Sequence, residues 1–290
     1  MFDQKTKIKK VIVFLLFLTT VLSWRAVFSA SGENRLEVYF FDIGQGSSIF
    51  FQTPGGGKFL VDGGPNEAIL EKLGRTLPFH DKYLDVLLLT HPDADHLAGL
   101  LAVARNYEIG LVLETCVQEE SELAKLWEKE LAERSIRKIC LKAGDKLSFG
   151  PGGSLEFLYP FSSLEGQTFK DVNESSAVAR LDFGENSFLI TGDADQKVER
   201  GLVFRQANLD VDFLQVGHHG SKTSSGEAFI EAASPLAAII QAGKNNRYGH
   251  PHEETLKTLE KFGAAVWRTD QTGDIALVCD FQVCLRSEAP

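Results

Sequence analysis

Residues 90–99 read Thr-His-Pro-Asp-Ala-Asp-His-Leu-Ala-Gly, and this stretch determines how the chain is interpreted. It follows an apolar run at 84–90, typical of a buried strand, and opens a segment with helical spacing of apolar residues at 96–106. His91, Asp93, Asp95 and His96 supply two imidazoles and two carboxylates, which are ligand types for divalent metals. A helix N-cap would explain one carboxylate and neither histidine. We therefore expect a metal site where this strand meets this helix.

Two other predicted strands end in residues of the same kinds. An apolar run leads into Thr-Gly-Asp193, and another leads into Val-Gly-His218-His219-Gly-Ser221. Taken alone, each motif is a weak signal. Ligands gather at open strand ends in layered α/β proteins, so these side chains are expected to converge with the residues of 90–99.

Strand and helix patterns alternate along the rest of the chain. Strands are expected at 36–42, 47–53, 58–62, 84–90, 110–116, 135–141, 155–159, 176–183, 187–191, 211–216, 236–241, 265–267 and 275–279. Helices are expected at about 66–77, 96–106, 121–134, 195–207, 225–233 and 251–262, where Pro251 suits a first turn. Each half resembles a meander followed by crossovers, which predicts two sheets packed face to face with helices outside. Residues 33–288 are treated as one domain, because no linker rich in Pro or Ser divides them.

The first 32 residues differ in character from the rest. Four lysines precede an apolar run at 11–22, and small residues follow at 29–32. This pattern predicts an export signal or an uncleaved N-terminal membrane anchor, which would engage the membrane or the export machinery. The protein is then expected outside the cytoplasm, whether periplasmic, extracellular or anchored to the cytoplasmic membrane.

Charge and cysteine content exclude some classes of protein. The net charge of −10 argues against bulk electrostatic wrapping by nucleic acid. None of the four cysteines forms a C-x-x-C pattern, which disfavours a zinc ribbon. Cys116 and Cys140 each end a strand-like run, so they could form a disulfide, although buried free thiols fit equally well.

The motifs together resemble the metallo-β-lactamase fold superfamily, and within it the hydrolase domain of ComEC-type DNA-uptake competence proteins and its free-standing relatives. The stretches that carry the resemblance are 41–47, 60–64, 90–99, 189–193, 217–224 and 246–252. The resemblance implies an αββα sandwich of two mixed β-sheets with helices on the outer faces. It also implies one or two divalent metal ions held by His91, Asp93, Asp95, His96, Asp193 and His219 or its neighbour His218.

Two departures from the superfamily pattern affect the choice of metal. Asp93 stands where a second histidine is usual, and Asn173, Ser175 and Ser176 lie where another histidine is expected. Because both changes replace imidazole with oxygen, manganese becomes a rival to zinc. Asp62 matches an aspartate that supports the site.

The resemblance implies hydrolysis by a metal-activated water, which Asp95 would orient. His250 could donate a proton to the leaving group or bind a phosphoryl oxygen, or it could simply start a helix. Ser221, Lys222 and Thr223, which follow the paired histidines, form either an anion cradle at a helix entrance or an ordinary solvated turn. Tyr248 is a further candidate for supporting the site or contacting substrate.

We expect a phosphodiesterase or nuclease acting on nucleic acid or a phosphorylated envelope polymer, without a nucleotide cofactor. The alternatives are a lactone or β-lactam hydrolase and a catalytically silent metal-binding module.

Overall fold

The computed structural model describes residues 9–10, 12–20, 22–23, 35–150 and 152–289. The described residues before 35 are helical and exposed. The small residues at 29–32, which belong to the predicted export signal, lie outside the described part. Within the described residues, no helix combines the length and apolarity needed to cross a bilayer.

Two β-sheets form the centre of the molecule. The first has eight strands in the order β15-β14-β1-β2-β3-β4-β5-β6. Its strands are β1 (Leu36–Phe40), β2 (Ile49–Gln52), β3 (Lys58–Val61), β4 (Tyr83–Leu89), β5 (Glu108–Glu114), β6 (Lys138–Cys140), β14 (Ile275–Cys279) and β15 (Cys284–Ser287). Neighbours from β15 to β3 pair antiparallel and those from β3 to β6 pair parallel, so the sheet is mixed.

The second sheet has seven strands in the order β13-β12-β11-β10-β9-β8-β7. These are β7 (Lys146–Ser148), β8 (Gly153–Tyr159), β9 (Val178–Phe183), β10 (Asn186–Ile190), β11 (Phe213–Gln215), β12 (Ala237–Ile240) and β13 (Ala265–Arg268). Strands β10 to β13 run parallel, and the other pairs are antiparallel.

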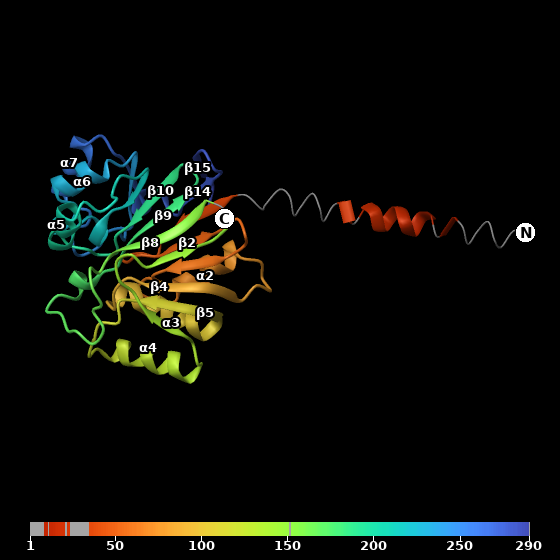
Figure 1. Ribbon diagram of the computed structural model, residues 1–290, viewed down its shortest axis with the longest axis horizontal. Coiled ribbons are helices and arrows are strands. Elements are labelled where there is room, and N and C mark those ends of the chain that lie inside the picture. Colours follow the sequence, from red (N-terminus) through yellow and green to blue (C-terminus); the bar gives the residue numbers. More distant parts are fainter. Residues whose placement is uncertain (1–8, 11, 21, 24–34, 151, 290) are drawn as a thin grey trace, which may run out of the picture.

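The helices cover the outer faces of both sheets, as Figure 1 shows. The helices α2 (Ala68–Thr76), α3 (Ala94–Asn106) and α4 (Glu122–Glu133) pack on the first sheet, and α5 (Gln196–Phe204), α6 (Glu227–Ala233) and α7 (Glu253–Lys261) pack on the second. A short helix, α8 (Thr269–Thr272), and two 3₁₀-helices, η1 (Val172–Ser175) and η2 (Gly217–Gly220), lie in connections.

A large apolar core fills the space between the sheets, with Phe51, Phe157 and Phe188 among its buried members. Burial of alternate strand residues on this shared face is what holds the two sheets together. The predicted αββα sandwich of two mixed sheets is confirmed.

Some predicted boundaries differ from those in the structure. Helix α3 begins at Ala94 instead of residue 96, because the Asp93 carboxylate accepts a hydrogen bond from the Ala94 N–H at 2.7 Å. Pro251 precedes helix α7 and is not part of its first turn, because the next residue, His252, is the N-cap and bonds through its N–H to the Gly220 carbonyl. The short strands β7 and β15 were not predicted from the sequence.

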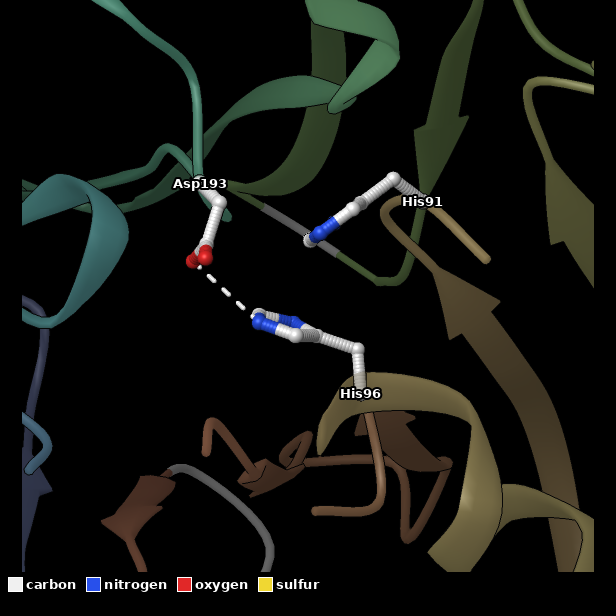
Figure 2. A group of neighbouring side chains, drawn as sticks. All are labelled: His91, His96 and Asp193. Atoms are coloured by element: carbon white, nitrogen blue, oxygen red, sulfur yellow. Dashed lines mark ion pairs between the residues drawn. The ribbon is translucent and has the colours of Figure 1, made fainter. Parts of the chain in front are cut away.

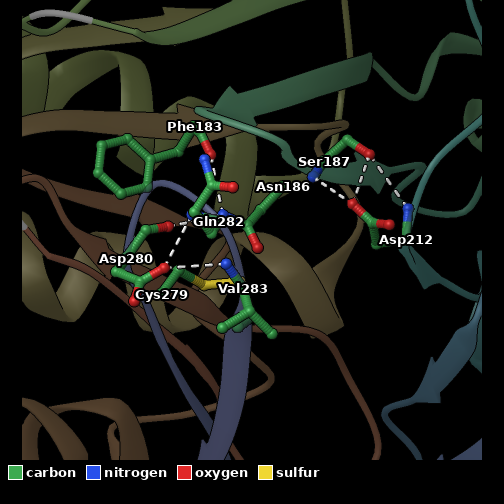
Figure 3. The surroundings of a disulfide bond; sticks show 9 residues. Phe183, Asn186, Ser187, Asp212, Cys279, Asp280, Gln282 and Val283 are labelled. Carbon is green, nitrogen blue, oxygen red and sulfur yellow. Dashed lines mark hydrogen bonds between the residues drawn. A yellow bond between two sulfur atoms is a disulfide. The ribbon is translucent and has the colours of Figure 1, made fainter.

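Both pairs of cysteines form disulfides. Cys116 joins Cys140 across the ends of β5 and β6, so the predicted disulfide is confirmed over the alternative of two free thiols. Cys279 joins Cys284 across the β14–β15 hairpin, whose turn is drawn in Figure 3. The Asp280 carboxylate in that turn accepts hydrogen bonds from the Gln282 and Val283 N–H groups.

Two glycines let helix α3 lie directly against the turn after β3. The Gly63 N–H donates to the His96 carbonyl at 2.8 Å, and the Gly99 N–H donates to the Gly64 carbonyl at 2.9 Å. A Cβ added at Gly99 would lie 1.8 Å from the Gly63 oxygen. This backbone contact fixes the first turn of α3 beside the turn that carries Asp62.

We expect Gly99→Ala to lower the free energy of unfolding by about 3 kcal/mol, because the helix must move away from backbone atoms that cannot yield. Gly74→Ala is the matched control. Gly74 is exposed in helix α2 with no atom near the added Cβ, so alanine there should stabilise by up to about 1 kcal/mol. Urea unfolding of both variants measures the difference, and equal effects would contradict this account of the contact.

Candidate metal centre

Five side chains from four segments meet at one edge of the sandwich. His91 follows strand β4, Asp95 and His96 lie in the first turn of α3, Asp193 follows β10, and His219 lies in η2. All but Asp95 are almost fully buried. The convergence of strand ends that the sequence predicts is therefore found.

Potential ligand atoms lie close enough together to share an ion. One atom from each of His91, His96 and Asp193 lies within 4.8 Å of the others, and the same holds for Asp95, His96 and His219. Figure 2 shows the first of these groups, with Asp193 facing His96 and His91 beside them. The Asp193 Oδ1 atom is 3.2 Å from His96 Nε2, and its Oδ2 atom is 3.5 Å from His219 Nε2. Asp193 thus belongs to the first group and also faces His219 of the second, so its two oxygens lie between the groups.

Three histidines present the same ring nitrogen to the centre. His91 Nδ1 lies 3.1 Å from Thr90 Oγ1, and His219 Nδ1 lies 2.9 Å from the Gln241 carbonyl oxygen. The Thr90 hydroxyl already donates to Asp62, so it accepts from His91. Since the proton of each ring is held on Nδ1, the Nε2 lone pair is left for a ligand.

Asp62 holds the third of these histidines. Its Oδ2 atom lies 2.7 Å from His96 Nδ1 and accepts from the Thr90 hydroxyl at 2.7 Å, while its Oδ1 atom accepts from the Thr90 N–H at 2.8 Å. A carboxylate that accepts the Nδ1 proton fixes the orientation of the imidazole and makes its other nitrogen more basic. The supporting role predicted for Asp62 has this geometric basis.

The facing atoms lack hydrogen-bond partners. They are the Nε2 atoms of His91, His96 and His219 and the Oδ1 atom of Asp193, all buried within the described residues. Leaving several such atoms unsatisfied in one place is costly, unless an ion satisfies them together. The donor set of imidazole and carboxylate suits zinc or manganese.

The site shifts the pKa values of its members in opposite directions. Burial, followed by repulsion from His96, lowers the pKa of His91 to about 4. Burial opposes charge on His96 as well, but the neighbouring Asp193 and Asp62 carboxylates raise its pKa above the usual value. The pKa of Asp193 lies well below its usual range, because the histidines outweigh its burial. An ion must displace the proton that the carboxylates favour on His96, so metal affinity is expected to fall as the pH falls.

Asp93 and His218 occupy different positions from these five. The Asp93 carboxylate caps helix α3, and neither ligand group includes it. His218 Nε2 lies 3.4 Å from the Asn173 side-chain amide and 3.8 Å from Asp193 Oδ2, so it is further from the centre than His219. The geometry therefore favours His219 over His218, and ligand roles for Asp93 and His218 remain predictions.

A cavity of about 640 Å³ opens above the centre. Its lining includes Asp95, Asp193 and His219 of the centre together with Arg247, Tyr248 and His250. The carbonyl of His250 accepts from the Asn246 side-chain amide at 2.6 Å, and its N–H donates to Asn246 Oδ1 at 3.0 Å. A loop following β12 thus presents His250 to the ligand residues.

His250 is suited to binding an oxygen. Its Nδ1 atom faces the Gln45 amide nitrogen at 3.4 Å, which places the ring proton on Nε2. Burial, with repulsion from the neighbouring histidines, lowers the pKa of His250 to about 4. A neutral ring can donate a hydrogen bond to a phosphoryl oxygen at pH 7. The protonated ring that would be needed to give a proton to the leaving group is scarce at that pH. Among the roles that the sequence suggests for His250, this geometry favours binding of a phosphoryl oxygen.

The residues of the predicted anion cradle are not among those that line this cavity. Ser221 is buried just after η2, and Lys222 lines a separate hollow next to helix α7. Helix α6 starts at Glu227, so Ser221 is not at a helix entrance. Arg247 is the only lysine or arginine among the residues that line the cavity in the described structure.

Apart from Asp62, the sequence did not reveal the residues that set the positions of the histidine protons. Gln45, Thr90 and Gln241 each contact a histidine of the site, yet none is a metal-ligand type. Gln45 lies in the glycine-flanked turn at 43–46, and that turn was the one available signal.

Layered sheets with a His/Asp centre at their edge are the arrangement of metal-dependent proteins of the αββα class, most familiar as hydrolases. A profile described as "Metallo-beta-lactamase superfamily" matches residues 41–244, and the chain belongs to this superfamily. The resemblance inferred from the motifs is confirmed.

Sequence relatives and solved structures agree with this assignment. The chain is 34% identical over 288 residues to ComE operon protein 3 of Bacillus subtilis and 31% identical over 261 residues to competence protein ComA of Neisseria gonorrhoeae. The two alignments cover 91% and 89% of this chain but 34% of each relative, so the chain spans about a third of their length. The metallo-beta-lactamase fold protein YhfI of B. subtilis shares the fold, with a TM-score of 0.53 and 15% identity over 88% of this chain and all of that one.

Proposed function

We propose that the protein is a phosphodiesterase that cleaves nucleic acid or a phosphorylated envelope polymer, with zinc or manganese at the His/Asp centre. One observation supports this most strongly. A single cavity is lined by ligand residues of the centre together with Arg247 and His250. A phosphodiester needs a cation and hydrogen-bond donors for its oxygens, and this cavity supplies both.

Each residue would then have a definite task. A divalent ion, when bound, lowers the pKa of water toward about 7 and so supplies a nucleophile at neutral pH. Asp95, which is partly exposed and lines the cavity, accepts a hydrogen bond from the attacking water and orients it. His250 and Arg247 donate to the phosphoryl oxygens and hold the phosphorus in line with that water.

The direct test is a screen of purified protein on bis-p-nitrophenyl phosphate and single-stranded DNA, with and without added manganese or zinc. Release of p-nitrophenol that depends on metal would support the proposal. Turnover of a lactone or β-lactam with no phosphodiester turnover would replace it with the alternative hydrolase. Bound metal without turnover of any of these substrates would favour the silent module.

Arg247→Gln should raise KM for single-stranded DNA several-fold and reduce the slope of log affinity against log salt by about 0.7, because one phosphate contact is lost. Lys222→Gln is the matched comparison, since Lys222 lies at another hollow. It should have a smaller effect than Arg247→Gln. A larger effect of Lys222→Gln would restore the cradle predicted from sequence and contradict the role of Arg247.

The protein is also proposed to act outside the cytoplasm. The lysines and apolar run before residue 23 support export, and so do the two disulfides, because disulfides persist in oxidising compartments. The likeness to competence proteins is consistent with a place in the cell envelope.

A reporter enzyme that works only in the cytoplasm, fused after Pro290, should therefore be silent. The same fusion lacking residues 1–32 should be active, which controls for expression. Strong activity of the full fusion would show that the segment does not export.

A further inference from the structure

One exposed aromatic side chain stands at the mouth of the cavity. Tyr248 is 50% exposed, and it is the only one of the exposed large apolar or aromatic side chains of the described residues that lines this cavity. Other exposed aromatic rings, such as Phe79 and Phe204, lie away from it. A half-exposed ring next to a functional centre calls for an explanation that packing does not supply.

The loop that carries Tyr248 is ordered by other residues. The side-chain amide of Asn246 donates to the carbonyls of Gly243 and His250, and its oxygen accepts from the N–H groups of Tyr248 and His250. These bonds involve the backbone of Tyr248 and leave its ring unused. The ring can therefore be replaced without removing the bonds that shape the loop.

The ring is nevertheless held in a fixed position. It stacks on the His250 imidazole, with centroids 5.6 Å apart and planes 23° apart. The Arg247 guanidinium donates to the Tyr248 hydroxyl at 2.8 Å and lies 4.9 Å from the ring centroid. A rigid ring beside a guanidinium presents flat, polarisable surface next to a positive charge.

The Tyr248 side of the cavity lies close to the metal centre. The His250 ring, on which Tyr248 stacks, is 6.3 Å from the ring of His219. A bound molecule that covers the Tyr248 ring can thus place an adjoining phosphate next to the side chains of the metal centre, with Arg247 beside it.

We propose that Tyr248, supported by Arg247, is a stacking platform for a nucleobase of single-stranded nucleic acid. This inference rests on the proposed phosphodiesterase function and selects nucleic acid over an envelope polymer without bases. In a duplex the faces of each base are already covered by neighbouring pairs, so the platform favours single strands. Stacking on an aromatic ring accepts any base, so little sequence preference is expected.

The test compares two labelled oligonucleotides of equal length, an oligothymidylate and an abasic strand with the same backbone. Both carry phosphorothioate linkages to resist cleavage, and fluorescence anisotropy measures their binding to the metal-loaded protein. The wild type should bind the oligothymidylate about ten-fold more tightly than the abasic strand. Tyr248→Leu should abolish this preference, whereas Tyr248→Phe should keep it, because phenylalanine preserves the ring and loses only the bond to Arg247.

Equal binding of the two strands by the wild type would overturn the platform, as would no binding of either strand or a preference unchanged in Tyr248→Leu. A separate cleavage assay on ordinary DNA separates this inference from the function on which it rests. Cleavage without base preference in binding refutes the platform alone. Base-dependent binding without cleavage of any phosphodiester supports the platform as a binding site and refutes the phosphodiesterase.

Discussion

Asp95→Ala should remove most of the bound metal and reduce phosphodiester turnover to near background, while the fold stays largely intact. Asp95 supplies one of the two carboxylates at the centre, and its Oδ2 atom lies 3.2 Å from His219 Nε2. Although burial opposes charge, contact with His219 keeps the pKa of Asp95 below its usual value, so the group is an anion at neutral pH. Metal content by elemental analysis and the initial rate on bis-p-nitrophenyl phosphate measure the two effects.

Asp93→Ala is the matched control for this variant. Asp93 lies two residues away and caps helix α3, so its loss should cost about 1 kcal/mol of stability. If capping is its only role, metal content and rate should change little, and a large loss of metal would confirm the ligand role predicted from sequence. Full activity of Asp95→Ala after metal removal would refute metal-assisted hydrolysis.

Asp62→Asn should weaken metal binding by about 10- to 100-fold without removing any ligand. The asparagine has one acceptor oxygen where Asp62 now accepts from Thr90 N, Thr90 Oγ1 and His96 Nδ1. His96 then loses its orientation, and His91 is affected through the Thr90 hydroxyl. Titration of metal-free protein with manganese or zinc gives the affinity, and excess metal should restore much of the rate.

Asp212→Asn provides a control at an aspartate that makes related contacts beside the other sheet. Asp212 Oδ2 accepts from the N–H and hydroxyl of Ser187, as drawn in Figure 3, much as Asp62 accepts from Thr90. Its loss should lower stability and leave metal affinity unchanged. If Asp62→Asn behaved in the same way, Asp62 would be a structural residue and not a positioning residue for His96.

The sequence predicted the parts of the site that depend on strand ends. His91, Asp193 and His219 each follow an apolar run. These runs become the strands β4, β10 and β11, whose ends meet at one edge of the sandwich although β4 belongs to the other sheet. The sandwich itself followed from the alternation of strand and helix patterns. Boundaries were less predictable where a side chain decides them, as with Asp93 at the start of α3.

Features that depend on distant contacts could not be predicted. His218 and His219 both have left-handed backbone, with φ of 49° and 55°, and this conformation directs the second ring to the Gln241 carbonyl. No local pattern reveals which of two adjacent histidines turns inward. Strands β7 and β15 were missed because they are short edge strands with partly exposed residues, which have little hydrophobic alternation.

The central claim is that the five converging side chains hold an ion that hydrolysis requires. The most direct measurement is the rate of bis-p-nitrophenyl phosphate hydrolysis by the purified protein before chelation, after chelation, and after stepwise return of manganese or zinc. We expect the rate to fall to background when the ion is removed and to recover as one or two ions per chain are restored. A rate that is unchanged by complete removal of metal would contradict the claim.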